Sequence, residues 1–479
     1  MEVLQRTANR GSVSTGYDIK YSNKFESDNS EGIIRNYDAS TGANCIANNS
    51  TTNAKKFTVS YWVKKTELLA SGQNIPWIAI AGGYATVVKF QDEKFAAYDD
   101  TAGWSLATNA VFRDTSAWYH LVCAVDTTQS TASDRVNLYV NGVLQTSFST
   151  ENYGTQNADN QLWKVNTSHT IGNQAYFKGG YIAELHCIDG TQYAASDFGE
   201  YDDDSGIWIP KEADVTYGDQ GYYLNWSDFG SANSNANNTG VGKDHSGNTN
   251  PFVNLDGWSS ADIATDTPTN NFCTLNPLYK CADTTMTDGA TNCDRTNNGN
   301  NTVRGTFVVT TGKWYWEVAV HRGTVNTNYP FMGMTGNFTT EPCSWLYGDS
   351  KSFYVSGSGS VEDAGSYKGA GTAAAQDPSH SIYGFAVDID NEELYWYTNG
   401  TVNNSGNAYS ISTSVGNSDE GMTPFLFMFT GANQSFNFGG YSVITPSSAA
   451  SDANGYGTFE YAPPSGYYAL CTKNLAEFG

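Results

Sequence analysis

The chain has 479 residues and a formal net charge of −24, from 49 acidic and 25 basic residues. A single hydrophobic core stops growing at about 250–300 residues, so this length predicts two or three domains. The negative charge argues against nucleic-acid binding, which needs basic patches to neutralise phosphates, and an aromatic content of 14% argues against a disordered chain.

The first 210 residues divide into a polar arm and a strand-rich region. Residues 1–20 are rich in Gly and Ser without hydrophobic periodicity, so they are interpreted as an N-terminal arm, either a disordered tail or a segment that docks into a larger assembly. Residues 21–210 carry repeated strand patterns, as in 57–63, where apolar and polar positions alternate. The pair Asn141-Gly142 supplies the two positive-φ positions of a type I′ turn and predicts an antiparallel hairpin.

Five segments within residues 21–210 follow one another in a recognisable order. They are residues 57–65 (FTVSYWVKK), 118–122 (WYHLV), 136–142 (VNLYVNG), 171–173 (IGN) and 179–185 (GGYIAEL). In this order they resemble the strands of concanavalin A-like domains of the laminin-G type. The resemblance implies that residues 21–210 form one β-sandwich.

Residues 211–300 are rich in Asn, Asp, Thr and Gly, and their polarity predicts an irregular connecting segment without a core of its own. Residues 242–248 (GKDHSGN) and 266–272 (DTPTNNF) resemble the connecting segment of virion proteins from marine bacteriophages. In those proteins a similar phrase joins laminin-G-like and SPRY-like modules.

Residues 301–447 predict a second sandwich. The segments 312–318 (GKWYWEV), 383–388 (YGFAVD), 394–400 (LYWYTNG) and 424–427 (PFLF) resemble SPRY domains in spacing and order, and Asn399-Gly400 repeats the hairpin signal. Residues 448–479 are interpreted as a C-terminal tail. The predicted fold is therefore all-β: two tandem antiparallel β-sandwiches of the jelly-roll, concanavalin A-like type, joined by an irregular polar segment.

Membrane and redox signals point to a chain folded in a reducing cytoplasm. No apolar run approaches the ~20 residues needed to cross a bilayer, and the N-terminus lacks the apolar stretch of a secretory signal. The eight cysteines include Cys123 and Cys187, which lie in apolar strands and are predicted to be buried free thiols. The spacings of Cys273, Cys281 and Cys293 match no zinc pattern.

One acidic cluster suggests catalysis. Asp388, Asp390 and Glu392 would share one face if the strand before them continued, as the paired carboxylates of concanavalin A-like glucanases do. The apolar strand, however, ends at Ile389 and the next begins at Leu394, which predicts a solvated hairpin turn. No catalytic residue is therefore predicted, and the chain is expected to be non-enzymatic.

The candidate binding residues are acidic and aromatic side chains in polar loops. Asp99 and Asp100 could offer oxygen ligands to Ca²⁺ at a sheet rim, or they could be merely solvated; no other cofactor is expected. Sugars stack their C–H faces on aromatic rings, so Trp104, Trp163 and Trp345 are the predicted glycan-binding residues. The alternative is that each of these rings caps its sandwich.

These features together favour a non-enzymatic bacteriophage virion protein that acts as a lectin-like adhesin for host-surface glycans. The alternatives are a structural decoration or fibre subunit that contacts only other virion proteins, and a polysaccharide depolymerase that rests on the Asp388 cluster alone. The expected partners are other virion proteins and a bacterial surface glycan, without nucleic acid or membrane insertion, in a homo-oligomer. The expected location is the particle surface, after assembly in the host cytoplasm.

Overall fold

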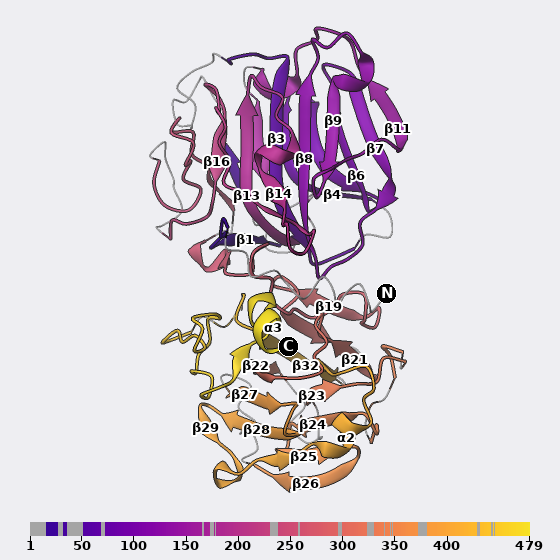
Figure 1. The fold of residues 1–479 in the computed structure, drawn as a ribbon, viewed down its shortest axis with the longest axis vertical. Helices are drawn as coiled ribbons and strands as arrows, with labels where there is room; N and C mark the ends of the chain where they lie inside the picture. Colours follow the sequence, from indigo (N-terminus) through magenta and orange to yellow (C-terminus); the bar gives the residue numbers. More distant parts are fainter. Residues whose placement is uncertain are drawn as a thin grey trace. The chain divides into compact units, whose positions relative to one another are not determined.

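The chain folds into two compact units. The structure is a computed structural model that describes residues 16–26, 32–35, 51–68, 72–164, 167–172, 177, 179–229, 238–256, 259–295, 299–322, 330–339, 341–344, 346, 348–371, 381–428, 432–441, 444 and 446–479. The first unit extends from the first described residue to Thr269, and the second from Asn270 to Gly479 (Figure 1). Each is an antiparallel β-sandwich, which confirms the predicted fold class.

The first unit is built from two sheets. One has the order β10-β9-β8-β3-β13-β1-β18, with β16 also paired to β13. Its strands are β1 (Ser22–Phe25), β3 (Lys56–Lys65), β8 (Trp118–Asp126), β9 (Val136–Val140), β10 (Val143–Leu144), β13 (Gly180–Asp189), β16 (Tyr222–Leu224) and β18 (Ile263–Ala264). The other sheet has the order β11-β7-β6-β5-β4-β12-β2-β17. Its strands are β2 (Gly32–Arg35), β4 (Gln73–Ala81), β5 (Tyr84–Gln91), β6 (Lys94–Asp99), β7 (Trp104–Val111), β11 (Phe148–Tyr153), β12 (Ser168–Ile171) and β17 (Val253–Asp256).

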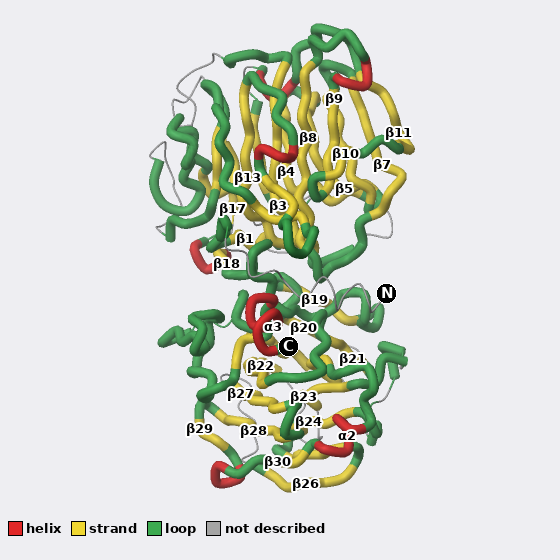
Figure 2. The backbone as a smooth tube through the Cα atoms, viewed as in Figure 1, coloured by secondary structure: helices red, strands yellow, loops and turns green. Residues whose placement is uncertain are grey.

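Shorter elements connect these strands; Figure 2 draws the helices among them in red and the loops in green. They are the hairpin β14 (Gly199–Tyr201) with β15 (Trp208–Pro210), and the 3-10 helices η1 (Ala132–Asp134), η2 (Gln161–Trp163), η3 (Ala195–Asp197) and η4 (Ser260–Asp262).

Strand β3 shows how the core of the first unit forms. Its alternate residues Phe57, Val59, Tyr61 and Val63 all join the central hydrophobic cluster, as the alternation predicts. The opposite face of the strand is also buried, since a second cluster around Val122, Ile188 and Phe198 covers the outer side of the same sheet. This sheet therefore buries side chains on both of its faces.

The described part of residues 211–300 is mostly irregular, but it belongs to the two units and is not a separate connecting segment. Strands β16, β17 and β18 complete the two sheets of the first unit, and the unit boundary falls inside the segment, after Thr269. The segment pairs mainly through backbone hydrogen bonds at sheet margins, which polar residues satisfy as well as apolar ones. The segment also contributes core side chains: Tyr222, Leu224, Trp226, Val241 and Phe252 in the first unit, and Phe272, Cys273, Leu275 and Cys293 in the second.

The second unit also contains two sheets. The order of one is β19-β20-β32-β22-β27-β28-β29, with β30 paired to β28 and β33 to β22; the order of the other is β21-β31-β23-β24-β25-β26. The strands of the first of these sheets are β19 (Thr284–Thr287), β20 (Asn292–Arg295), β22 (Lys313–Arg322), β27 (Ser381–Asp388), β28 (Glu393–Thr398), β29 (Thr401–Val402), β30 (Tyr409–Ser410), β32 (Ala432–Asn437) and β33 (Tyr468–Ala469). Those of the second are β21 (Asn301–Arg304), β23 (Phe331–Thr335), β24 (Ser352–Ser356), β25 (Ser360–Asp363), β26 (Ser366–Ala370) and β31 (Thr423–Met428).

The helices of the second unit are short. They are the 3-10 helix η5 (Asn404–Gly406) and the α-helices α2 (Ser412–Gly416) and α3 (Thr472–Phe478). Across the described residues, no helix has the length and apolar character needed to span a bilayer.

Residues 448–479, predicted as a tail, are an integral part of the second unit. Strand β33 runs parallel to β22, and α3 packs its Leu475 into the central hydrophobic cluster. The buried carboxylate of Glu317 on β22 accepts hydrogen bonds from the backbone N–H groups of Glu460 (2.9 Å) and Tyr461 (2.8 Å). The Glu317 carboxylate on β22 thus holds the C-terminal segment in place.

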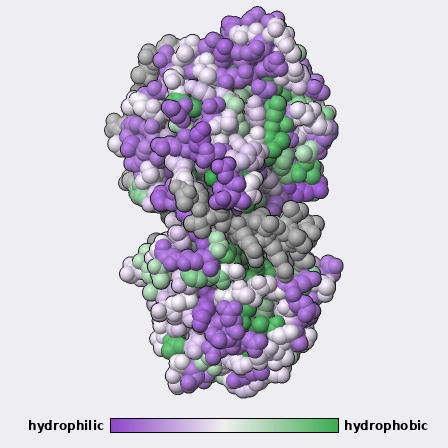
Figure 3. All heavy atoms as spheres, viewed as in Figure 1, coloured by the Kyte–Doolittle hydropathy of each residue, from purple (hydrophilic) through white to green (hydrophobic). Residues whose placement is uncertain are grey.

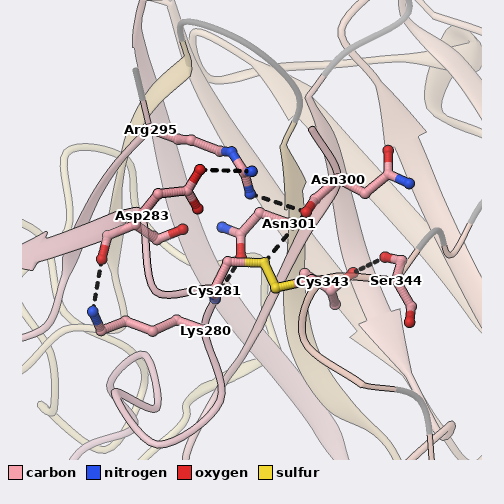
Figure 4. Close-up of a disulfide and its surroundings, with 10 residues drawn as sticks. Lys280, Cys281, Asp283, Arg295, Asn300, Asn301, Cys343 and Ser344 are labelled. Carbon is pink, nitrogen blue, oxygen red and sulfur yellow. Dashed lines mark hydrogen bonds and ion pairs between the residues drawn. A yellow bond between two sulfur atoms is a disulfide. The ribbon is translucent and has the colours of Figure 1, made fainter. Parts of the chain in front are cut away.

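A disulfide joins Cys281 and Cys343 in the second unit (Figure 4). It connects the loop before β19 to the loop after β23. Each of these loops also forms a hydrogen bond with β21. Cys123 and Cys187 are buried free thiols, as predicted. The sequence analysis did not predict the disulfide, whose two cysteines lie 62 positions apart in the sequence.

Candidate functional site

A hollow of about 590 Å³ opens at one margin of the first unit. It lies where the β4–β5 hairpin, the loop between β6 and β7 and the helix η2 meet. Its lining residues are Ala81, Gly82, Tyr84, Asp100, Thr101, Gln161 and Lys164. This volume falls in the range of small-molecule sites, roughly 300–1,000 Å³.

The β4–β5 hairpin forms one wall of the hollow. Gly82 and Gly83 have φ values of +58° and +84°, which a two-residue type I′ turn requires. No atom lies within 4 Å of a Cβ built on either glycine, so the turn borders open space. Tyr84 follows directly and leaves 57% of its surface exposed. The hollow therefore has one aromatic ring at its margin with room beside it.

Asp99 holds the base of the hollow together. Its side chain is buried, and Oδ1 accepts hydrogen bonds from the backbone N–H groups of Thr101 (2.9 Å) and Ala102 (2.7 Å). Its Oδ2 accepts from the N–H of Gln161 (2.8 Å) and from the hydroxyl of Thr86. Burial raises the pKa of Asp99, and these hydrogen bonds oppose that effect. One carboxylate thus ties β5, the β6–β7 loop and η2 to one another.

The polar groups of the hollow differ in charge and in hydrogen-bonding capacity. Gln161, buried except for 4% of its surface, accepts a hydrogen bond at Oε1 from the Thr101 hydroxyl (2.7 Å). Asp100 is exposed, and its Oδ2 accepts the backbone N–H of Ala85 (2.8 Å). Lys164 is exposed as well. An aromatic face beside an amide, a hydroxyl, a carboxylate and an ammonium group suits a polyhydroxylated ligand.

The predicted glycan-binding tryptophans do not line this hollow. Trp104 is 1% exposed and donates from Nε1 to Asn160 Oδ1 (2.9 Å), and Trp163 is 8% exposed and packs on the His169 ring. Both belong to the central hydrophobic cluster, so the prediction of exposed stacking platforms is wrong for these two residues. They cap the sandwich, which was the alternative interpretation. Trp345 lies outside the described residues.

Tyr84 is the aromatic residue that the sequence interpretation missed. The signal was present: Gly82-Gly83 after the apolar residues 77–80 is a two-residue hairpin turn. The first residue of the returning strand then stands at the sheet margin, where a ring stays accessible.

The surroundings of Asp99 do not suit a cation. Both of its carboxylate oxygens already accept hydrogen bonds from N–H or O–H groups, and such donors repel a metal ion. One carboxylate oxygen of Asp100 accepts a hydrogen bond from the backbone N–H of Ala85. Within the described part of the chain, no three His, Cys, Asp or Glu side chains are grouped closely enough to hold a metal. The Ca²⁺ interpretation of Asp99 and Asp100 thus gains no support.

The acidic cluster of the second unit lies in a turn, as predicted. Strand β27 ends at Asp388 and β28 begins at Glu393. Asp388 pairs with Lys313 Nζ (2.6 Å) and accepts from Asn391 Nδ2 (2.7 Å). Burial alone would raise the pKa of Asp388, but the bonds from Lys313 and Asn391 outweigh it and lower the pKa. Asp390 accepts the N–H of Gly312 (3.1 Å). These contacts brace the hairpin.

Both units are antiparallel β-sandwiches. Residues 38–192 of the first unit match a family model described as the concanavalin A-like lectin/glucanases superfamily. All residues that line the hollow fall within this match. The chain matches no curated protein.

Several solved structures resemble parts of the chain. The SPRY domain of human HERC1 is 9% identical, with 36% of this chain and 99% of that domain covered at a TM-score of 0.28. A putative carbohydrate binding protein from Bacteroides ovatus is 11% identical, with 50% of this chain and 59% of that chain covered at a TM-score of 0.30. A pentraxin from Limulus polyphemus is 11% identical, with 37% and 80% covered at a TM-score of 0.26. Likenesses at TM-scores this low carry no functional conclusion.

Proposed function

We propose that the first unit is a carbohydrate-binding module and that its hollow holds the sugar. The observation that carries this proposal is the exposed ring of Tyr84 beside the polar groups of Asp100, Thr101 and Gln161. The match of residues 38–192 to a lectin/glucanase family model supports the same class of ligand.

The chemistry of binding follows from the positions of these groups. One apolar face of a pyranose packs against the Tyr84 ring, and its hydroxyl groups point toward the hollow. The Thr101 hydroxyl donates to Gln161 Oε1 and keeps its oxygen as an acceptor for a sugar hydroxyl; Asp99 holds this base rigid, so little side-chain entropy is lost on binding. Asp100 accepts from sugar hydroxyls at the margin.

The proposed activity is binding without catalysis. Glycoside hydrolysis needs one carboxyl group that stays protonated and a second that is ionised on the other side of the bond. Asp388 is held ionised by Lys313, and Asp390 is engaged by a backbone N–H group, so neither suits the role of the acid. Their place in a hairpin turn supports a structural role.

In biological terms we propose a bacteriophage virion protein that adheres to a glycan on the bacterial surface. The resemblance of residues 242–248 and 266–272 to virion proteins of marine phages supports this setting. A shallow sugar site binds weakly, and many copies on one particle would raise the avidity by orders of magnitude. The second unit, with its resemblance to SPRY domains, would then contact other virion proteins.

The test compares two exposed tyrosines. Tyr84→Ala removes the ring at the hollow, and Tyr367→Ala is the matched control because Tyr367 is 64% exposed on β26 of the second unit. Binding of host polysaccharide and of a broad glycan panel is measured by calorimetry with the full chain. We expect Tyr84→Ala to weaken binding about tenfold or more, and Tyr367→Ala to leave it unchanged. No binding by the native chain to any glycan, or an equal effect of both variants, would refute the proposal.

A further inference from the structure

A second surface of the first unit exposes apolar side chains around the Asn141-Gly142 hairpin. Its members, termed here the hairpin patch, are Leu144, Tyr201 and Trp208. Leu144 is 44% exposed and Tyr201 51%. Figure 3 shows hydrophobic atoms gathered on the flank where Figure 2 labels β10. Contiguous exposed apolar groups of this kind mark interaction sites more often than single exposed residues do.

Two hairpins hold the hairpin patch in a fixed arrangement. Gly142 lies under the Trp208 ring so closely that a Cβ on the glycine would stand 2.3 Å from a ring carbon. Tyr201 meets Trp208 edge to face at 4.9 Å between ring centroids. The Tyr201 hydroxyl donates to the carbonyl oxygen of Asn141 (3.4 Å). The β9–β10 and β14–β15 hairpins are therefore locked together, and a partner would meet a preformed surface.

The hairpin patch also borders an open sheet edge. Strand β10 is the last strand in the order of its sheet. Val143 and Val140 form the pair that closes the turn, so the next pair, Leu144 with Tyr139, is a non-hydrogen-bonded one. The N–H and C=O groups of Leu144 therefore point away from β9. Through these two groups Leu144 can pair with one residue of an added segment, and side-chain contacts must supply the rest of the binding.

Acidic side chains surround the apolar centre. Asp202, Asp203 and Asp204 occupy the turn between Tyr201 and Ile207, and Glu200 precedes them on β14. Asp203, Asp204 and Glu200 are exposed. A second copy of the chain would bring the same acidic groups and a net charge of −24 against this surface, which like-charge repulsion opposes. A basic partner would be attracted to it.

We propose that the hairpin patch docks an extended protein segment that carries alternating apolar and basic side chains. The segment adds to the edge of β10 through the Leu144 backbone. Its apolar residues cover Leu144, Tyr201 and Trp208, and its Lys or Arg residues pair with Asp203 and Asp204. This site lies apart from the residues that line the hollow, so it does not depend on glycan binding.

The test uses defined peptides of about eight residues with the full chain. The probe alternates Val with Lys, and its counterpart alternates Val with Glu. Binding is followed by fluorescence anisotropy of the labelled peptides. We expect the Val/Lys peptide to bind about tenfold or more tightly than the Val/Glu peptide, and to weaken as NaCl rises from about 50 to about 500 mM.

Matched variants localise the binding. Leu144→Ser is expected to weaken the Val/Lys peptide about tenfold, and Leu278→Ser is the control because Leu278 is 58% exposed in the second unit. Asp203→Asn with Asp204→Asn should reduce the dependence on salt. The proposal is overturned if neither peptide binds, if both bind equally, or if Leu144→Ser and Leu278→Ser act alike. Self-association of the native chain that Leu144→Ser abolishes would assign the surface to a second copy instead.

Discussion

Replacing Cys281 and Cys343 together by Ser removes the covalent link between two loops of the second unit. The bond closes a loop of 62 residues. The loss of chain entropy that such a closure imposes on the unfolded state corresponds to about 4 kcal/mol at 25 °C. For a unit of this size each kcal/mol moves the melting temperature by about 2–4 °C, so we expect a decrease of roughly 10 °C.

The native geometry near the bond should survive the substitution. The N–H of residue 281 donates to Asn301 Oδ1 (3.1 Å), and the N–H of Thr302 donates to the carbonyl oxygen of Pro342 (2.7 Å). Both contacts use backbone groups of the two loops and do not need the sulfur atoms (Figure 4). The loss of stability should therefore come mainly from the unfolded state.

Differential scanning calorimetry of the full chain measures this prediction, because the first unit serves as an internal reference. Only the transition of the second unit should move, and a reducing agent should move the native protein to the same position. Cys343 is exposed, whereas the free cysteines of the described residues are buried, so the reductant acts on the bond. A shift of less than about 2 °C, or a shift in the transition of the first unit, would show that this reasoning is wrong.

Three further predictions concern single side chains. Gly142→Ala should destabilise the first unit by about 2 kcal/mol or more, because it adds a clash with Trp208 to an unfavourable φ of +78°. Gly83→Ala is the control: its φ is +84° but the space around it is open, so it should cost only about 1 kcal/mol. Urea denaturation measures both. Burial lowers the pKa of His169 to about 3, so below its ordinary pKa of 6.5 a proton binds this residue only in the unfolded state. Its contribution to stability is therefore lost as the pH falls, by about 1 kcal/mol between about pH 6 and pH 5. Burial lowers the pKa of His120 in the same way, so His169→Gln should reduce the slope of urea midpoints against pH by about half. Glu317→Ala removes the carboxylate to which the backbone N–H groups of Glu460 and Tyr461 donate. The C-terminal segment should then be held less firmly, so limited proteolysis should cut near Glu460 faster than in the native chain.

Strand periodicity was the part of the fold that the sequence could predict well. Alternation over residues 57–63 reports which side chains face the core, because successive residues of a strand point to opposite faces. The Asn-Gly turns were equally clear, since few other pairs adopt positive φ at two successive positions. Both signals depend only on neighbouring residues, and such local signals were enough to predict the all-β fold class.

The binding residues could not be predicted in the same way, because exposure depends on distant parts of the chain. Trp104 stands among polar loop residues in the sequence, yet its ring turns inward to Phe57 and Asn160. Tyr84 follows an apolar strand that suggests burial, yet its ring remains exposed at the sheet margin. Residues 81–84, 100–101 and 161–164 meet only in the folded unit, so no single window of sequence contains the hollow.

The two Asn-Gly hairpins share the same turn geometry but differ in the surroundings of the strands that follow. Asn141 exchanges two hydrogen bonds with the backbone of His120, one through its N–H (2.9 Å) and one through its Oδ1 (2.7 Å). Asn399 does the same with Ile382, at 2.8 Å and 2.9 Å. In both turns the glycine lies under an aromatic ring from later in the chain, Trp208 or Tyr461.

The strands that leave these two turns differ in their surroundings, and this difference decides their roles. After Gly142, β10 leaves Val143 and Leu144 exposed beside an acidic turn. After Gly400, the backbone closes as it does after Gly142: the N–H of Asn403 donates to the Trp396 carbonyl oxygen (3.0 Å), and the N–H of Gln145 donates to that of Leu138 (2.8 Å). The second hairpin adds a side-chain bond from Asn403 Nδ2 to Thr398 Oγ1 (3.1 Å). Strands β10 and β29 both end the strand order of their sheets. The shared motif therefore fixes the turn and its backbone bonds, while the exposed apolar residues and the acidic turn beside β10 distinguish the first hairpin.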